Sequence, residues 1–312
     1  MRIAILDDYQ QVALTSADWS VVDGEVVAFA DHVADPEALV ARLAGFDVVV
    51  AMRERTPFPG SLLARLPDLR LLVTTGAANA SIDVEAARAA GVVVCGTGAS
   101  AAAAPELTWA LLMALLRHVP VEDANVRAGR WQTTVGGELA GRTLGLLGLG
   151  RIGQYLARYG RAFDMPVIAW SQNLTAEAAA AHGARLVTKD ELFELADVVS
   201  VHLKLSDRSR GLVGEAELAR LGPRGYLVNT SRGPIVDETA LLAALRDGTI
   251  AGAALDVFDV EPLPADHPLR TAPNTVLTPH VGYVTRETYA AFYGEAVEDV
   301  RAWAAGEPVR QL

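Results

Sequence analysis

The stretch "TLGLLGLGRIGQYLARYG" (143–160) decides how the chain folds. The apolar run that opens it predicts a strand, and "RIGQYLARYG" predicts a helix. Gly148, Gly150 and Gly153 form the pattern GxGxxG at the turn between them, a context that makes a weak pattern specific. Such a turn lets backbone N–H groups and the helix N-terminus approach a pyrophosphate. The stretch therefore predicts a dinucleotide-binding turn.

Strand-like and helix-like segments alternate through most of the remaining chain. β-branched apolar runs predict strands buried on both faces at 2–6, 25–29, 47–52, 69–75 and 91–96. Segments of helical period with capping residues lie at 35–45, 60–68 and 81–91. This alternation predicts right-handed crossovers and parallel sheets. The rhythm breaks at 96–131, where one helix over 105–117 is expected to lead into a second domain, and 285–306 predicts one long closing helix.

The composition limits the classes of protein to which the chain can belong. Its 312 residues exceed what one ordinary core fills, so two domains are expected. The net charge of −11 argues against nucleic acid or an anionic membrane as the main partner. Cys95 is the single cysteine, so no internal disulfide is possible, and we expect no metal site. The N-terminus does not resemble a signal peptide, which favours a cytoplasmic protein.

The strand after the glycine-rich turn lacks the acid that often binds the ribose hydroxyl of NAD. It ends instead at Ser171, Gln172 and Asn173, which offer hydrogen bonds without charge. Arg151, within the glycine pattern, and Lys204, after the strand expected beside the adenosine pocket, add positive charge. The sequence thus does not decide between NAD(H) and NADP(H) as the cofactor, although it slightly favours NADP(H).

Three further polar segments each follow a predicted strand: "VNTSRGPIVDE" (228–238), "LDVFDVEPL" (255–263) and "LTPHVGYVT" (277–285). Ligands of open α/β sheets bind outside the carboxyl ends of the strands, so Arg232, Glu261 and His280 are expected near the dinucleotide. A histidine can exchange a proton near neutrality, a carboxylate can fix its tautomer, and a guanidinium can grip a carboxylate with two hydrogen bonds. Together they predict hydride and proton transfer to a 2-oxo acid.

In this order, GLGRIG, "NTSRGPIVDE", "DVFxxEP" and "TPHVG" resemble the D-isomer-specific 2-hydroxyacid dehydrogenase family over essentially the whole chain. The resemblance implies two Rossmann-like or flavodoxin-like, doubly wound parallel-sheet domains with the active site in the cleft between them. Residues 1–98 and 285–312 would form the substrate domain, and 99–284 the dinucleotide-binding domain. It also implies a homodimer formed through the cofactor domain.

The resemblance also assigns roles to single residues. It implies that Arg232 binds the substrate, that His280 donates and accepts the proton, and that Glu261 pairs with it. Asp256 would lie near the nicotinamide amide, and Arg53 in "MRERT" would face the substrate. The other implied cofactor contacts are Ile152, Thr230 and Gly282, and the implied substrate contacts are the backbone N–H groups of Gly76, Ala77 and Ala78.

The chain departs from the family pattern at three positions, and several alternative functions stay open. Lys204 replaces a usual proline, Tyr283 replaces a small residue, and residue 171 is not acidic, so substrate size and cofactor choice are undecided. A phosphite or phosphoglycerate dehydrogenase is possible within the family. A formate dehydrogenase is disfavoured, because that group normally has Gln at the position of Glu261. A cofactor-sensing, corepressor-like binding protein is the alternative of another class.

Overall fold

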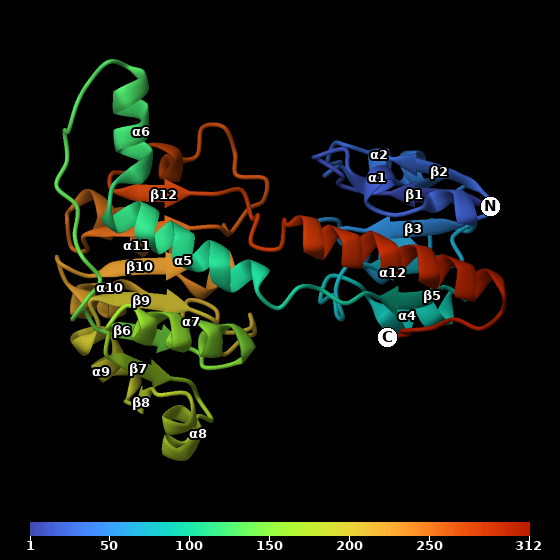
Figure 1. Ribbon diagram of the computed structural model, residues 1–312. Helices are drawn as coiled ribbons and strands as arrows, with labels where there is room; N and C mark the ends of the chain where they lie inside the picture. Colours follow the sequence, from blue (N-terminus) through green and yellow to red (C-terminus); the bar gives the residue numbers. More distant parts are fainter. The chain divides into compact units, whose positions relative to one another are not determined.

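The computed structural model describes residues 1–312, which fold into two compact units, shown in Figure 1. Unit 1 comprises Met1–Ser100 and Tyr283–Leu312, and unit 2 comprises Ala101–Gly282. The boundaries expected from the sequence place residues 99, 100, 283 and 284 with the second part instead. None of the helices combines the length and the apolar composition that crossing a bilayer requires.

Unit 1 is a five-stranded parallel sheet in the order β2-β1-β3-β4-β5, with helices on both faces. Its strands are β1 (Arg2–Ile5), β2 (Glu25–Ala28), β3 (Val48–Ala51), β4 (Leu71–Thr74) and β5 (Val93–Gly96). Its helices are α1 (Ala13–Ser16), α2 (Pro36–Leu43), α3 (Gly60–Leu63), α4 (Val84–Ala89) and α12 (Arg286–Ala304), with a 3₁₀ turn at Trp19–Val21.

Two cores fill the two faces of this sheet. The first lies under α1 and α12 and includes Phe292 and Tyr293, and the second lies under α2, α3 and α4. The strand order is that of a flavodoxin-like sheet, in which the chain reverses its direction of winding between β1 and β3. Loops that follow β1 and β3 therefore flank the switch point of unit 1.

Unit 2 is a seven-stranded parallel sheet in the order β12-β11-β10-β9-β6-β7-β8. Its strands are β6 (Leu144–Leu147), β7 (Val167–Trp170), β8 (Arg185–Leu186), β9 (Val198–Val201), β10 (Tyr226–Asn229), β11 (Gly252–Leu255) and β12 (Thr275–Leu277). Its helices are α5 (Ala103–Leu116), α6 (Val119–Arg127), α7 (Arg151–Ala162), α8 (Ala176–Ala181), α9 (Lys189–Leu195), α10 (Glu215–Leu221) and α11 (Glu238–Arg246), with 3₁₀ turns at Gly233–Ile235 and Pro268–Thr271.

The unit 2 sheet is also covered on both faces. Apolar side chains of α5, α7 and α8 form one core, and those of α9, α10 and α11 form the other. Winding reverses between β6 and β9, so the glycine-rich turn after β6 lies at the switch point. Both units thus confirm the predicted doubly wound parallel sheets.

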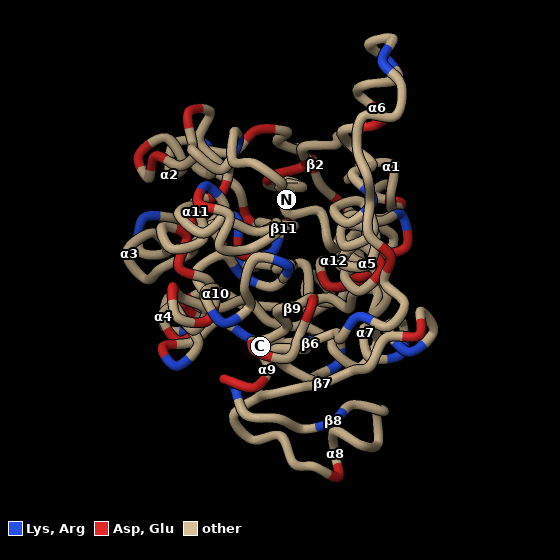
Figure 2. Tube along the Cα trace, turned by 90° about the vertical axis from the view of Figure 1, so that its left-hand side faces the viewer, with Lys and Arg blue, Asp and Glu red and all other residues tan.

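The structure differs from the sequence-based expectation in some helices. α3 ends at Leu63 rather than near residue 68, because Pro67 disfavours helical geometry in the residue before it. The expected helix over 105–117 is present as α5, but a second helix, α6, follows it directly. In Figures 1 and 2, α6 projects from the rest of unit 2, and Figure 2 shows acidic and basic residues scattered over the elements.

Candidate active site

The glycine-rich turn joins β6 to α7 at the switch point of unit 2. Gly148 has a φ of +107°, and a Cβ there would lie 2.8 Å from the carbonyl oxygen of His202. A Cβ on Gly153 would lie 2.3 Å from the carbonyl oxygen of Gly148, so neither position admits a side chain. A Cβ on Gly150 would meet no atom within 4 Å, which leaves open space at the turn. A dinucleotide-binding turn needs a glycine for the tight turn, a glycine that leaves room for the pyrophosphate and a glycine where helix and strand pack closely. Gly148, Gly150 and Gly153 meet these requirements in that order.

The N-terminus of α7 provides the electrostatics for an anion at this turn. Gly150 is the N-cap residue and supplies no capping side chain, so the first N–H groups of the helix remain available as donors. Arg151 is exposed at the first helical position, whereas Ile152 packs against the unit 2 core. The turn therefore fits the pyrophosphate of a dinucleotide.

The loop after β7 contains no carboxylate. Ser171 is half-buried, while Gln172 and Asn173 are exposed. Lys204, which follows β9, is also exposed. His202, nearby in the chain, adds no charge, because burial lowers its pKa to about 3 and its Nε2 lies 2.8 Å from the Ser200 hydroxyl. Arg151 and Lys204 are the cations that follow β6 and β9 most closely in the chain.

Arg232 lies two residues beyond Thr230 in the loop after β10. The Asn229 side chain donates to the carbonyl of Arg232 at 2.9 Å, and Nη1 of Arg232 donates to the carbonyl of Ser231 at 2.7 Å. A Cβ on Gly233 would lie 2.1 Å from the carbonyl carbon of Phe258, so only glycine lets the two loops pack this closely. The hydroxyl of Thr230 lies 2.7 Å from that of Thr108 on α5.

Glu261 and His280 form a hydrogen-bonded pair, although they follow different strands. Nδ1 of His280 lies 2.5 Å from Oε2 of Glu261, while Oε1 of Glu261 accepts from the backbone N–H of Phe258 at 3.0 Å. Both side chains are about one-fifth exposed, which keeps the pair partly desolvated. His280 has a φ of +54°, the left-handed region, a strained conformation that often occurs at functional sites.

Asp256 holds the loop that carries His280. Its Oδ1 accepts from the Thr278 hydroxyl at 2.6 Å and from the backbone N–H of Val281 at 2.8 Å. Its Oδ2 accepts from the backbone N–H of Gly282 at 2.8 Å. The side chain is fully buried, and burial raises the pKa of its carboxyl, against the opposing effect of these hydrogen bonds. The expected position of Asp256 beside the nicotinamide amide stays a prediction.

In unit 2, His280 can exchange a proton with a bound molecule, and Arg232 can bind an anion. With Nδ1 of His280 on Glu261, Nε2 is the ring nitrogen placed to exchange a proton with a bound molecule. The carboxylate stabilises the imidazolium form, and the guanidinium of Arg232 can bind a carboxylate with two parallel hydrogen bonds. All three groups follow carboxyl ends of strands in the sheet whose switch point holds the glycine-rich turn.

The remaining expected substrate residues lie in unit 1, after β3 and β4. Arg53 has a φ of +51°, its backbone N–H donates to the Thr75 hydroxyl at 3.0 Å, and its Nη1 donates to the Thr75 carbonyl at 3.2 Å. The backbone N–H of Gly76 donates to the Thr97 hydroxyl at 2.8 Å, so it is already used inside the protein. The exposed residues Ala77 and Ala78 remain as backbone donors for a ligand.

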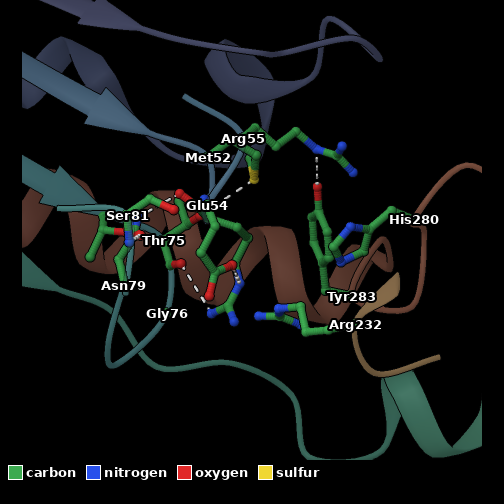
Figure 3. Close-up of polar contacts among 12 residues, drawn as sticks. Met52, Glu54, Arg55, Thr75, Gly76, Asn79, Ser81, Arg232, His280 and Tyr283 are labelled. Atoms are coloured by element: carbon green, nitrogen blue, oxygen red, sulfur yellow. Dashed lines mark hydrogen bonds and ion pairs between the residues drawn. The ribbon is translucent and has the colours of Figure 1, made fainter. Parts of the chain in front are cut away.

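The sequence interpretation missed Arg55. Its Nε donates to the hydroxyl of Tyr283 at 3.0 Å, as Figure 3 shows, and its guanidinium lies near the ring of Tyr9. Residues 55 and 283 are 228 positions apart, so no local pattern could have joined them. The one available signal was the unusual Tyr283 itself.

The parallel sheets and the glycine-lined turn define a dinucleotide-binding α/β protein, and comparisons with known proteins identify its family. Residues 109–282 match the family described as "D-isomer specific 2-hydroxyacid dehydrogenase, NAD binding domain". A glyoxylate reductase of Aeropyrum pernix is 42% identical over 256 residues, which cover 79% of this chain and 76% of that protein. The chain belongs to the D-isomer-specific 2-hydroxyacid dehydrogenase family and is thus an NAD(P)-dependent oxidoreductase.

Two further relatives are phosphoglycerate oxidoreductases. The D-3-phosphoglycerate dehydrogenase of Bacillus subtilis is 37% identical over 281 residues, which cover 89% of this chain. The chain spans about half the length of that relative, since the match covers 53% of it. The solved structure of a phosphoglycerate oxidoreductase from Vibrio cholerae is similar with a TM-score of 0.92 and 38% identity, covering 98% of this chain and 99% of that one.

Proposed function

We propose that this enzyme interconverts a 2-oxo acid and the D-2-hydroxy acid, with His280 as proton donor and acceptor. The observation that carries the proposal is the contact of 2.5 Å between Nδ1 of His280 and Oε2 of Glu261. A charge-assisted hydrogen bond of this kind orients the ring and stabilises the imidazolium that reduction requires. Bound NAD(P)H supplies the hydride.

The protein's own groups account for the remaining steps. Arg232 binds the substrate carboxylate and polarises the neighbouring carbonyl with its planar guanidinium. His280 delivers the proton from Nε2 to the carbonyl oxygen during reduction, and it takes that proton back during oxidation. Asp256 keeps His280 in place through its hydrogen bonds to residues 278–282. In unit 1, Arg53 and the N–H groups of Ala77 and Ala78 provide further contacts for the substrate.

Oxidation of NADH and NADPH in the presence of glyoxylate, pyruvate, hydroxypyruvate or 2-oxobutanoate tests the reaction. We expect turnover with at least one of these short acids and formation of the D-enantiomer of the product. A folded protein that binds NADH but oxidises it with none of them would contradict the proposal and would favour the cofactor-sensing alternative.

For the cofactor, we propose weak discrimination with a slight preference for NADPH. The loop 171–173 offers no carboxylate to repel a 2′-phosphate, and Arg151 and Lys204 are exposed cations. Comparison of kcat/KM for NADH and NADPH with one good 2-oxo acid tests this. Rejection of NADPH by about a thousandfold, on the order of 4 kcal/mol, would contradict it.

For the oligomeric state, we propose a homodimer through unit 2. α6 and the segment that follows it expose several large apolar side chains: Val119, Val121, Val126, Trp131 and Val135. Residues of α5 and α6, among them Met113 and Val126, line a groove of about 570 Å³. On α5, Trp109 packs against Phe163 with ring centroids 4.9 Å apart, and its buried Nε1 has no hydrogen-bond partner. A second copy would cover the exposed apolar side chains of this surface.

Molar mass from light scattering of the eluting protein tests the homodimer. Trp131→Glu combined with Val135→Asp is expected to yield monomers, because both side chains are more than three-quarters exposed and their loss leaves each copy folded. Leu195→Asp, on the opposite face of unit 2, is the matched control and should stay dimeric. A monomeric wild type, or a double variant that remains dimeric, would refute this interface.

A further inference from the structure

The loop between β11 and β12 carries Glu261 near its start, and the first half of this loop lies mostly outside the core. Its exposed residues are Asp259, Val260, Pro262, Pro264, Ala265 and Asp266. Leu263 packs against the core of unit 2 but is only partly buried. Segments with few buried apolar contacts are the first to open locally. The position of Glu261 therefore depends on the polar contacts of the loop.

Arg270, near the end of the loop, binds the backbone that follows Glu261. Its Nε donates to the carbonyl of Pro264 at 2.7 Å, and its Nη2 donates to the carbonyl of Leu263 at 2.6 Å. Both donors belong to one planar guanidinium, so they hold the two adjacent carbonyls in a fixed relative position. Leu263 is two residues beyond Glu261 in the chain. Arg270 thus fixes the backbone directly after this carboxylate.

Arg270 is itself part of a segment that is attached to the core. It belongs to the 3₁₀ turn Pro268–Thr271, whose Leu269 is 1% exposed in the core of unit 2. His267 caps this turn, since its Nδ1 accepts from the backbone N–H of Leu269 at 3.3 Å. The other ring nitrogen of His267, Nε2, lies 2.9 Å from Oε1 of Glu238, the first residue of α11. The turn that carries Arg270 is therefore fixed both to the core and to α11.

Glu261 places its two carboxylate oxygens on different partners. Oε2 lies 2.5 Å from Nδ1 of His280, and Oε1 accepts from the backbone N–H of Phe258 at 3.0 Å. Phe258 is 7% exposed, so the core holds the backbone that precedes Glu261. The backbone that follows Glu261 is held by Arg270. A shift of that backbone would move Oε2 away from His280.

We propose that Arg270 is a positioning residue that keeps the carboxylate of Glu261 against Nδ1 of His280. It does so by holding the carbonyls of Leu263 and Pro264. This inference rests on the proposed function, in which that carboxylate orients the His280 ring and stabilises its imidazolium. Arg270 acts on the reaction through Glu261 alone, so its loss lowers the rate of reduction and leaves cofactor binding unchanged.

Arg270→Met removes the guanidinium and keeps an aliphatic side chain at this exposed position. With the best 2-oxo acid, we expect kcat for reduction to fall by about tenfold or more, because a displacement of about 1 Å at a reacting group costs about 10²-fold in rate. The Kd for NADH should stay at the wild-type value. Arg70→Met is the matched control in unit 1. Arg70 is also exposed and donates to two carbonyls, those of Pro67 at 2.7 Å and Leu69 at 3.2 Å, and its loss should leave kcat unchanged.

A double-mutant cycle shows whether Arg270 acts through Glu261. Glu261→Gln removes the charge that Arg270 positions, so in that background Arg270→Met should change kcat by less than about twofold. A general loss of stability would instead lower kcat by the same factor in both backgrounds. Arg270→Lys should recover part of the rate that Arg270→Met loses, since an ammonium can donate to a carbonyl but lacks the planar fork. Urea titration establishes that each variant is folded under the assay conditions.

The outcomes separate this inference from the proposed reaction. A folded Arg270→Met variant that keeps the wild-type kcat, or that loses the same factor in the Glu261→Gln background, overturns the role of Arg270 and leaves the proposed reaction standing. If Arg270→Met does not fold, Arg270→Lys takes its place in the cycle, and an equal loss of kcat in both backgrounds again overturns the role. A wild type that reduces no 2-oxo acid, or a Glu261→Gln variant with the wild-type kcat, would instead count against the proposed function.

Discussion

Asp256→Asn is the substitution that most sharply separates two roles for one buried carboxylate. In the wild type, Asp256 accepts hydrogen bonds from Thr278, Val281 and Gly282 at 2.6–2.8 Å. An amide can still accept through Oδ1 but places an NH₂ group opposite the N–H of Gly282. One buried donor is then left unsatisfied, at a cost of about 1–3 kcal/mol in the free energy of unfolding. The loop 278–282 relaxes away from this contact, and His280 moves with it.

The expected kinetic effect follows from that displacement. A catalytic group misplaced by about 1 Å loses about 10²-fold in rate, so kcat should fall by that order while the Kd for NADH changes little. Stopped-flow kinetics give kcat, NADH fluorescence gives the Kd, and urea titration gives the free energy of unfolding. Asp299→Asn is the matched control: it removes another fully buried carboxylate, in unit 1, and should leave kcat at the wild-type value. Weakened NADH binding with normal kcat and stability would refute this reasoning and place Asp256 at the nicotinamide amide.

Three further predictions follow from other parts of the molecule. Arg232→Lys should lower kcat/KM by about tenfold or more, because a point charge does not replace a bidentate fork, and near-normal kinetics with the best 2-oxo acid would exclude the proposed clamp. Ser171→Asp should shift the ratio of kcat/KM toward NADH by restoring an acceptor for the ribose hydroxyl and repelling a 2′-phosphate; an unchanged ratio would mean that another group selects the cofactor. Burial raises the pKa of Asp299 from 3.8 to about 7, which is above the pKa of this carboxyl in the unfolded chain. The protonated side chain therefore contributes its full stability below about pH 4, and this contribution is lost as the pH rises through 7. Relative to Asp299→Asn, the wild type should lose about 2–4 kcal/mol of unfolding free energy between pH 4 and pH 8. If urea titrations gave the same difference in unfolding free energy between the two proteins at both pH values, they would contradict this prediction.

Local sequence patterns predicted the parts of the fold that depend on neighbours in the chain. The strands of unit 1 begin and end within two residues of the predicted runs, because continuous β-branched segments have few other stable arrangements. The turn at 148–153 was predicted with its conformation, since Gly148 and Gly153 are required by backbone contacts next to them. α6 was missed: its valines Val119, Val121 and Val126 are exposed, so it has no apolar stripe that faces a core.

Long-range contacts limited what could be predicted of the site. The order of motifs suggested that Glu261 and His280 lie together, and the structure brings them into contact. The hydrogen bond from Gly76 to Thr97 could not be foreseen, because it joins the ends of two strands whose register is set by the whole sheet. Arg55 was overlooked for the same reason: its aromatic partners come from the start of the chain and from the segment before α12.

The measurement that tests the central claim most directly is kcat for 2-oxo acid reduction in His280→Ala, with NADH binding measured in the same preparation. The account predicts that kcat falls by about 10²–10⁴-fold, the usual contribution of a general acid, while the Kd for NADH stays at the wild-type value because the glycine-rich turn is untouched. A variant that binds NADH and keeps the wild-type kcat would show that the proton comes from another group and would contradict the role given to His280.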